Sequence, residues 1–287
     1  QYDLTDLFVA DSINQSGNYQ FDLIFSPRVA LNYRLKENLA IFAQVSHGFS
    51  PPGVEETLTP DGLFNPDIQP ETGWNYEIGS RGHFFQQRFS YDISIYTMDI
   101  RNLLVARRTA DDAFVGVNAG QTRHNGVEID LRYHILPVKF GKTLDLFVTY
   151  TLADYSFEDF VDAEQNFSGN ELTGVPRNLF NAGLDFHCSC GFYGNLNFQF
   201  VDEIPLRDDN SIFSESYTLL NTKVGFQKRF WDHINIDLFL GIQNLSNESY
   251  ASQVLINAGS FGGNAPRYFY PGLPRNYFGG FSLGFIF

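Results

Sequence analysis

Residues 277–287 read YFGGFSLGFIF, and large apolar side chains alternate there with small or polar ones. The apolar positions are Tyr277, Phe281, Leu283, Phe285 and Phe287, and the positions between them include Gly280, Ser282 and Gly284. Successive side chains of a β-strand point to opposite faces. A period of two therefore predicts a strand with one apolar face and one polar face.

The same alternation recurs along the chain in segments of about ten residues. Clear examples are 127–133, 180–186, 195–200, 220–227 and 236–243. Ten residues tilted near 45° cross about 24 Å, which matches the apolar band of an outer-membrane barrel. No segment approaches the roughly 18 consecutive apolar residues of a transmembrane helix. The pattern predicts an all-β fold, an antiparallel transmembrane β-barrel.

The segments between the strands alternate between short and long. Short turns are expected at 36–38, 86–87, 137–141, 189–191 and 231–233, and long loops at 11–20, 50–72, 106–120, 158–174, 202–216 and 251–273. Outer-membrane barrels have short periplasmic turns and long extracellular loops, so this asymmetry favours a barrel over a soluble sandwich. We expect eleven strands, and a twelfth within residues 2–10.

The composition agrees with strands in a membrane. Aromatic residues make up 16% of the chain, with 30 Phe and 15 Tyr, and flat rings pack well on a sheet. Those expected to form girdles at the two membrane interfaces are Tyr33, Phe49, Tyr133, Tyr150 and Phe230. The formal net charge of −14 argues against nucleic acid as a partner, because phosphate binding requires clustered Lys and Arg.

The two cysteines, Cys188 and Cys190, lie in a short Cys-Ser-Cys turn. A disulfide across so short a separation is expected to be strained, so we interpret both as ordinary turn residues. A redox or metal role is the alternative.

Five segments, taken in order, resemble the barrel of TonB-dependent receptors. They are SPRVALNYRLKENLAIFAQVSHGFSPP at 26–52, NPDIQPETGWNYEIGSRG at 65–82, NAGQTRHNGVEIDLRY at 118–133, GIQNLSNESY at 241–250 and PRNYFGGFSLGFIF at 274–287. They contain the motifs "GF.PP", "PE....YE.G", "N.G.....GVE" and "NL.N..Y", and a closing strand that ends on Phe. The resemblance covers essentially all 287 residues.

This resemblance implies a barrel of 22 strands in the outer membrane of a Gram-negative bacterium, enclosing an amino-terminal plug. Residues 1–287 would then be the carboxyl-terminal half of the barrel, with the plug and the first half absent. The chain opens at Gln1 without a signal peptide, and we expect an amino-terminal part upstream of it. The implied partners are a metal-chelate ligand, the TonB complex through the plug, and outer-membrane lipid. The resemblance implies no cofactor.

The implied function is active import of a metal chelate such as a ferric siderophore or ferric citrate. Such ligands are often anionic, so cationic and aromatic loop residues are candidates for binding them. The candidates are Arg107, Arg108, Arg207, Arg267, Tyr268 and Tyr270. Alternatively, each arginine pairs with a nearby carboxylate. The acidic residues Glu158, Asp159, Asp162 and Glu164 would bind a divalent cation or lie solvated in their loop.

Two other functions fit part of the pattern. A barrel enzyme of 12 strands, a lipase or protease, is disfavoured because the histidines form no recognisable pair with a nucleophile. They are His47, His83, His124, His134, His187 and His233. Ser46 and His47 are adjacent, so their side chains face opposite sides of a strand. We therefore do not expect an enzyme. A small passive porin is the remaining alternative, since a polar lumen suits it as well.

Overall fold

The computed structural model describes residues 2–3, 18–19, 23–53, 57–59, 65, 67–108, 114–136, 141–162, 165–231, 233–260 and 263–285. One antiparallel sheet of eleven strands dominates it, in the order β3-β4-β5-β6-β7-β8-β11-β12-β13-β14-β17. The expected all-β barrel wall and its eleven strands are confirmed. In the described part of the chain, no helix has both the length and the apolar character needed to cross a membrane.

The strands of the main sheet are β3 (Arg28–Lys36), β4 (Leu39–Ser50), β5 (Glu71–Phe84), β6 (Phe89–Arg108), β7 (Phe114–Leu136), β8 (Lys142–Asp159), β11 (Asn178–Cys188), β12 (Phe192–Val201), β13 (Tyr217–Phe230), β14 (Ile234–Gln243) and β17 (Asn276–Phe285). The short pairs are β1 (Tyr2–Asp3) with β2 (Asn18–Tyr19), β9 (Val161–Asp162) with β10 (Gln165–Asn166), and β15 (Ala251–Val254) with β16 (Phe269–Pro271).

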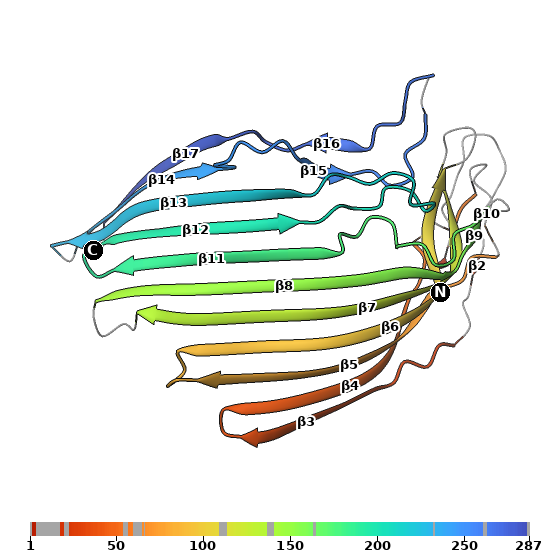
Figure 1. Cartoon of the computed structure of the whole chain (residues 1–287), viewed down its shortest axis with the longest axis horizontal. Helices are drawn as coiled ribbons and strands as arrows, with labels where there is room; N and C mark the ends of the chain where they lie inside the picture. The colour runs from red at the N-terminus through yellow and green to blue at the C-terminus, as the bar shows by residue number, and fades with distance from the viewer. Residues whose placement is uncertain are drawn as a thin grey trace.

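The strands of the main sheet form a curved wall in which each strand pairs with the next main-sheet strand along the chain (Figure 1). The short connections lie at one end of this wall and the long ones at the other (Figure 1). Four of the predicted short turns coincide with the breaks between strands, and residues 137–140 of the fifth lie outside the described residues. The asymmetry expected of an outer-membrane barrel is therefore present.

Two expectations about the connections are corrected. The segment 106–120 is not a long loop, because β6 extends to Arg108 and β7 begins at Phe114. Asn102 adopts a positive φ of 58°, and one register position is skipped there before the pairing of β6 with β7 resumes. Residues 2–3 pair with 18–19 outside the main sheet, and the rest of the expected twelfth strand, 4–10, lies outside the described residues.

One face of the wall is apolar across all its strands. Leu146, Leu184 and Leu196 follow one another in register on β8, β11 and β12. Val224 and Leu240, opposite each other on β13 and β14, are 60% and 71% exposed. Apolar side chains this exposed in the middle of a paired sheet face lipid in an outer-membrane barrel. All five residues of the predicted girdles lie on this outward face in the register of the strands.

The opposite face, which faces the lumen, is polar. One register row across five strands consists of His134, Asp145, Asp185, Asn195 and Lys223. In this row the imidazole Nδ1 of His134 lies 2.6 Å from Oδ1 of Asp145. The two faces of each strand therefore have different chemistry, as the alternation predicts.

Glycines on the lumen face lie opposite aromatic residues of the neighbouring strand. The register pairs are Phe42 with Gly79, Tyr96 with Gly126, Phe147 with Gly183, Tyr193 with Gly225, Phe278 with Gly241, and Phe239 with Gly280. In each pair a Cβ built on the glycine would overlap the ring. The ring covers backbone that a glycine otherwise leaves bare. The close approach of a ring explains why glycine is required at two motif positions, Gly79 and Gly126.

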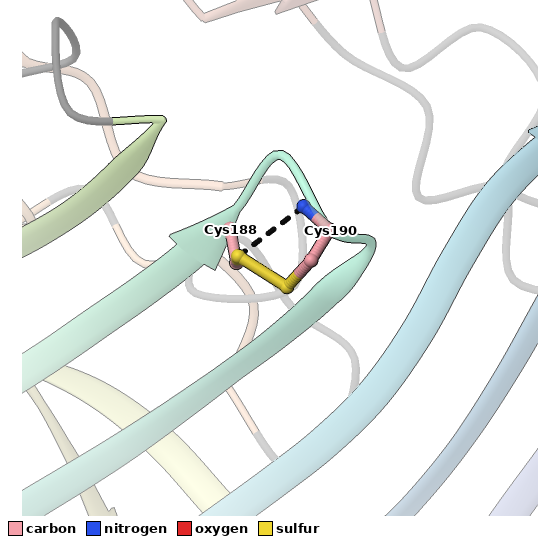
Figure 2. The surroundings of a disulfide bond; sticks show 2 residues. All are labelled: Cys188 and Cys190. Atoms are coloured by element: carbon pink, nitrogen blue, oxygen red, sulfur yellow. Dashed lines mark hydrogen bonds between the residues drawn. A yellow bond between two sulfur atoms is a disulfide. The ribbon is translucent and has the colours of Figure 1, made fainter.

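The cysteines do pair, contrary to the expectation from the sequence. Cys188 at the end of β11 forms a disulfide with Cys190 in the following turn (Figure 2). The turn brings their Cα atoms to 5.1 Å, which lies within the usual range for a disulfide. The amide of Cys190 also donates a hydrogen bond to Sγ of Cys188, at 3.2 Å. The disulfide lies at the rim that carries the short turns.

Candidate functional site

The long loops at the other rim form the candidate site, and the loop between β14 and β17 is closed at its base by motif residues. Asn244 is 2% exposed, and its side-chain amide donates to the carbonyls of Glu248, at 2.8 Å, and Leu273, at 3.1 Å. Oδ1 of Asn247 accepts from the amide of Arg275 at 2.9 Å. Both asparagines have positive φ, which asparagine tolerates better than most residues. The "NL.N..Y" motif thus has a structural role.

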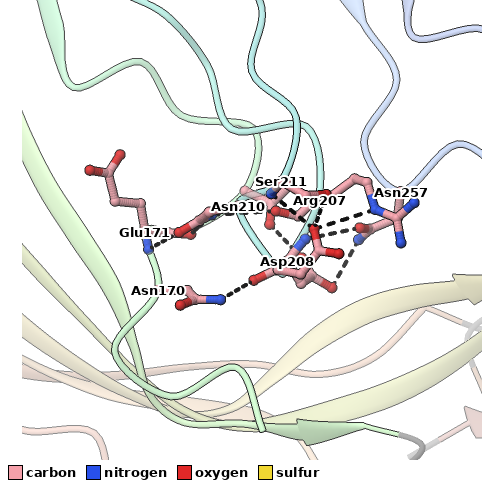
Figure 3. A network of polar contacts seen from close by, with 9 residues as sticks. Asn170, Glu171, Arg207, Asp208, Asn210, Ser211 and Asn257 are labelled. Carbon is pink, nitrogen blue, oxygen red and sulfur yellow. Dashed lines mark hydrogen bonds and ion pairs between the residues drawn. The ribbon is translucent and has the colours of Figure 1, made fainter. Parts of the chain in front are cut away.

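A polar network joins three of these loops (Figure 3). Asp208, between β12 and β13, accepts hydrogen bonds from Asn170 through its carbonyl, at 2.7 Å, and from Asn257 through Oδ2, at 3.0 Å. Its carboxylate also accepts from the hydroxyl of Thr173. Asn210 bonds the backbone of Glu171 in both directions, at 2.7 and 3.0 Å. We call residues 167–177, 202–216 and 254–257 the loop platform.

The base of the platform is apolar. Phe157 is 1% exposed and packs with Phe160 at 4.8 Å between ring centroids. Leu103 of β6 and Leu172 of the platform pack against this pair. Leu206, 0% exposed, is held through its backbone to Ile212 and Asn257. Side chains and backbone bonds therefore both fix the loops, which gives a ligand a shaped surface.

Arg207 lies on this platform but is already paired. Its Nε is 3.4 Å from Oδ1 of Asp209. The hydroxyl of Ser211 donates to that carboxylate and, ahead of the other causes, lowers the pKa of Asp209, with the charge of Arg207 adding to the effect. The alternative expected for a loop arginine therefore describes Arg207 better than a free ligand contact does.

Arg267, Tyr268 and Tyr270 lie together at the edge of β16. Arg267 is exposed and, within the described residues, makes no ion pair. Tyr268 is 8% exposed, its carbonyl accepts from the amide of Leu255 at 2.8 Å, and its hydroxyl has no hydrogen-bond partner in the part of the chain that the structure describes. Tyr270 is 50% exposed. The three residues are close in sequence, and the exposed guanidinium of Arg267 and the exposed ring of Tyr270 can each contact an anionic ligand that carries aromatic functions.

Arg107 and Arg108 lie elsewhere, near the tip of the β6–β7 hairpin, opposite Val115 and Phe114. Only their backbone belongs to the described residues. A second group of contacts fixes the stem of this hairpin. The amide of Leu104 donates to Oε1 of Glu71 at 2.6 Å, and Asn118 exchanges hydrogen bonds with the backbone of Gln69 at 2.8 and 2.9 Å. The candidate arginines are therefore divided between two groups of loops.

The acidic loop residues do not form a metal site in the described part of the chain, where no cluster of three or more His, Cys, Asp or Glu has suitable geometry. Glu158 pairs with Arg123 at 3.2 Å, and Glu164 lies outside the described residues. Asp162 pairs in register with Gln165 in a short hairpin. The residues that organise the platform, Asp208 and Asn257, carried no sequence signal, since each is one of many polar loop residues.

Comparison with known proteins places the chain in a family. Residues 1–245 match the family model described as TonB dependent receptor-like, beta-barrel. The chain therefore belongs to the TonB-dependent receptor β-barrel family. Members of this family lie in the outer membrane of Gram-negative bacteria, as the resemblance implied.

The chain also resembles individual receptors. It is 27% identical over 220 residues to the iron-regulated outer membrane virulence protein of Vibrio cholerae, covering 70% of this chain and 33% of that protein. The ferric-catecholate import receptor Fiu of E. coli K12 has a TM-score of 0.66 at 18% identity, over 94% of this chain and 35% of that one. The ferric citrate transporter FecA has a TM-score of 0.67 at 16% identity, over 90% and 38%.

These likenesses differ in what they establish. At such low identities the solved structures establish the fold alone. The chain spans about a third of the length of the curated relative. The family and these neighbours are receptors and transporters, a class that fits the expectation of a protein that is not an enzyme.

Proposed function

We propose that the chain is the carboxyl-terminal part of a receptor that imports a metal chelate, such as a ferric siderophore or ferric citrate, energised through TonB. The names of the relatives support the ligand class, since they include an iron-regulated protein, a ferric-catecholate receptor and a ferric citrate transporter. The plug and the first half of the barrel would precede Gln1 in the full receptor.

The observation that carries the ligand proposal is the group formed by Arg267, Tyr268 and Tyr270. The exposed guanidinium of Arg267 has no carboxylate partner among the described residues and offers several donors in a planar fork, which suits carboxylate, catecholate and hydroxamate oxygens. The hydroxyl of Tyr268 gains a partner if a ligand oxygen reaches it. In this proposal Arg107 and Arg108 are secondary contacts, whereas Arg207, already paired with Asp209, makes none.

The first test is Arg267→Ala in the full-length receptor. Uptake of a radioiron-loaded chelate should fall by about 10-fold or more, as for loss of one charge-assisted contact of about 1.5–3 kcal/mol. The amount of folded barrel in the outer membrane should not change. Arg207→Ala is the matched control, because Arg207 is already paired with Asp209. Normal uptake by Arg267→Ala would remove this residue from the site.

A separate test addresses the energy source, because the polar lumen suits a passive channel too. Uptake that stops in a strain lacking TonB supports active import, whereas uptake that continues supports a porin. Growth of a receptor-deletion strain on a panel of ferric chelates then identifies the ligand. Unchanged growth on every chelate would exclude the iron assignment.

A further inference from the structure

The outward face of the wall contains a large apolar hollow where β11 to β14 and β17 meet. Its volume is about 1020 Å³, at the upper end of ordinary ligand pockets. Two outward-facing glycines, Gly194 and Gly279, leave it without side chains at its floor. Leucines and phenylalanines surround them, namely Leu184, Phe186, Leu196, Phe226, Leu238 and Phe281.

The hollow runs from the rim with the short turns, on β11 to β13, to the middle of β14 and β17. Phe192, the first residue of β12, and Phe226 line it, and both are close to the turns that end at the periplasmic side. Since this face contacts hydrocarbon, the group that fills the hollow comes from the membrane. At this depth that group belongs to the periplasmic leaflet, which in Gram-negative outer membranes consists of phospholipid.

Two lysines lie on the outward face beside the hollow. Lys228 follows the lining residue Phe226 by two positions on β13, and its Nζ lies 5.9 Å from the ring centroid of Phe230. Lys142 on β8 is paired in register with Cys188 on β11, which lies two residues after the lining residue Phe186. Both are exposed, and neither makes an ion pair among the described residues. Lysines at the end of an apolar span extend their amines to the headgroup level.

We propose that this hollow binds one anionic phospholipid of the periplasmic leaflet. Its acyl chain lies against Gly194 and Gly279, and its phosphate is held between Lys142 and Lys228. Apolar area and two cations at the headgroup level together favour this occupant over a zwitterionic lipid. The site is separate from the extracellular loops, so the proposal does not depend on which ligand the receptor imports.

Native mass spectrometry of the full-length receptor in detergent tests this proposal, with dioleoyl phosphatidylglycerol and dioleoyl phosphatidylcholine as probes. We expect one phosphatidylglycerol to remain bound at collision energies that remove phosphatidylcholine. The double variant Lys142→Ser with Lys228→Ser should bind it about 20- to 30-fold more weakly, as for two cations near a membrane surface. Gly194→Leu, which fills the hollow, should also lose the bound lipid.

Two matched variants serve as controls. Lys36→Ser removes a lysine at the same rim but on β3, and Ala182→Leu enlarges an outward-facing residue outside the hollow. Both should retain the lipid, and heat-dependent gel mobility should show every variant folded. Equal retention of both lipids, retention by the lysine double variant or by Gly194→Leu, or loss in Lys36→Ser would each overturn the proposal. Preferential retention of added lipopolysaccharide would also overturn it, because that lipid belongs to the other leaflet.

Discussion

The wall and the loop platform are held together in different ways. In the wall, every strand of the main sheet except the terminal β3 and β17 is paired on both sides, and the side chains mainly face lipid or lumen. In the platform, side chains such as Asp208 and Asn257 supply the hydrogen bonds that backbone pairing supplies in the wall. A change in the wall should therefore affect folding of the whole barrel, whereas a change in the platform should affect the loops alone.

The largest effect is expected from a charge on the lipid face. Ile78 is 61% exposed on the outward face near the middle of β5. Ile78→Arg should destabilise the barrel by about 2–4 kcal/mol, because the guanidinium would face hydrocarbon. Gln199→Arg on the lumen face of β12 is the control and should change stability by less than about 1 kcal/mol. Urea unfolding in lipid vesicles measures both, and equal losses would show that the faces are not distinct.

The next effect tests the glycine–aromatic pairs. Gly183→Ala should cost about 1–3 kcal/mol, because the new Cβ would overlap the ring of Phe147. The same change should cost less in a Phe147→Ala background, where the ring is gone. Gly48→Ala is the control, since a Cβ there meets nothing within 4 Å. Unfolding of the parent, Gly183→Ala, Phe147→Ala and the double variant gives the coupling energy between Gly183 and Phe147. A coupling energy of zero would disprove the role of the ring.

A smaller effect, confined to the loops, is expected from Asp208→Ala. It removes the carboxylate bonds to Thr173 and Asn257, each of them a contribution of about 0.5–1.5 kcal/mol. Limited proteolysis should cut the loop between β12 and β13 several-fold faster, while urea unfolding of the barrel stays unchanged. Glu203→Ala in the same loop is the control. A lower barrel stability in Asp208→Ala would contradict the separation of wall and platform.

The smallest effect is a dependence of the platform on pH. Because the folded pKa of Asp209 is lowered, ionised Asp209 stabilises the platform above the ordinary pKa of 3.8. This contribution is lost as the pH falls through the lowered value. Proteolysis by an acid protease should therefore accelerate below about pH 4 in the parent and less so in Asp209→Asn. Identical pH profiles for the two proteins would contradict this role.

The sequence predicted the wall well because a membrane imposes a simple rule on it. Each strand must alternate between lipid and lumen, so segments such as 236–243 and 277–285 were recognisable from a period of two. The β6–β7 hairpin was mispredicted because its pairing continues past Asn102, where residues 103–106 are all apolar and the alternation of apolar and polar residues is lost.

The loops were less predictable. Arg207 and Arg267 look alike in the sequence, yet one is paired with Asp209 and the other is free of ion pairs among the described residues. The pairing of Arg207 is local, but the turn that brings Arg207 and Asp209 together is held by contacts between loops that are distant in sequence, such as Asp208 with Asn257. The structure explains several motif residues, in contrast. Gly79 and Gly126 lie under aromatic rings, and the Asn244 side chain closes the base of a loop.

The disulfide has a consequence for biogenesis. The two sulfurs belong to residues separated by one serine, so the bond ties no strand to any other. It can form in the oxidising periplasm while the chain is still unfolded, without fixing the order in which hairpins assemble. Oxidation before insertion is thus compatible with any route into the bilayer, which would not hold for a crosslink between distant strands.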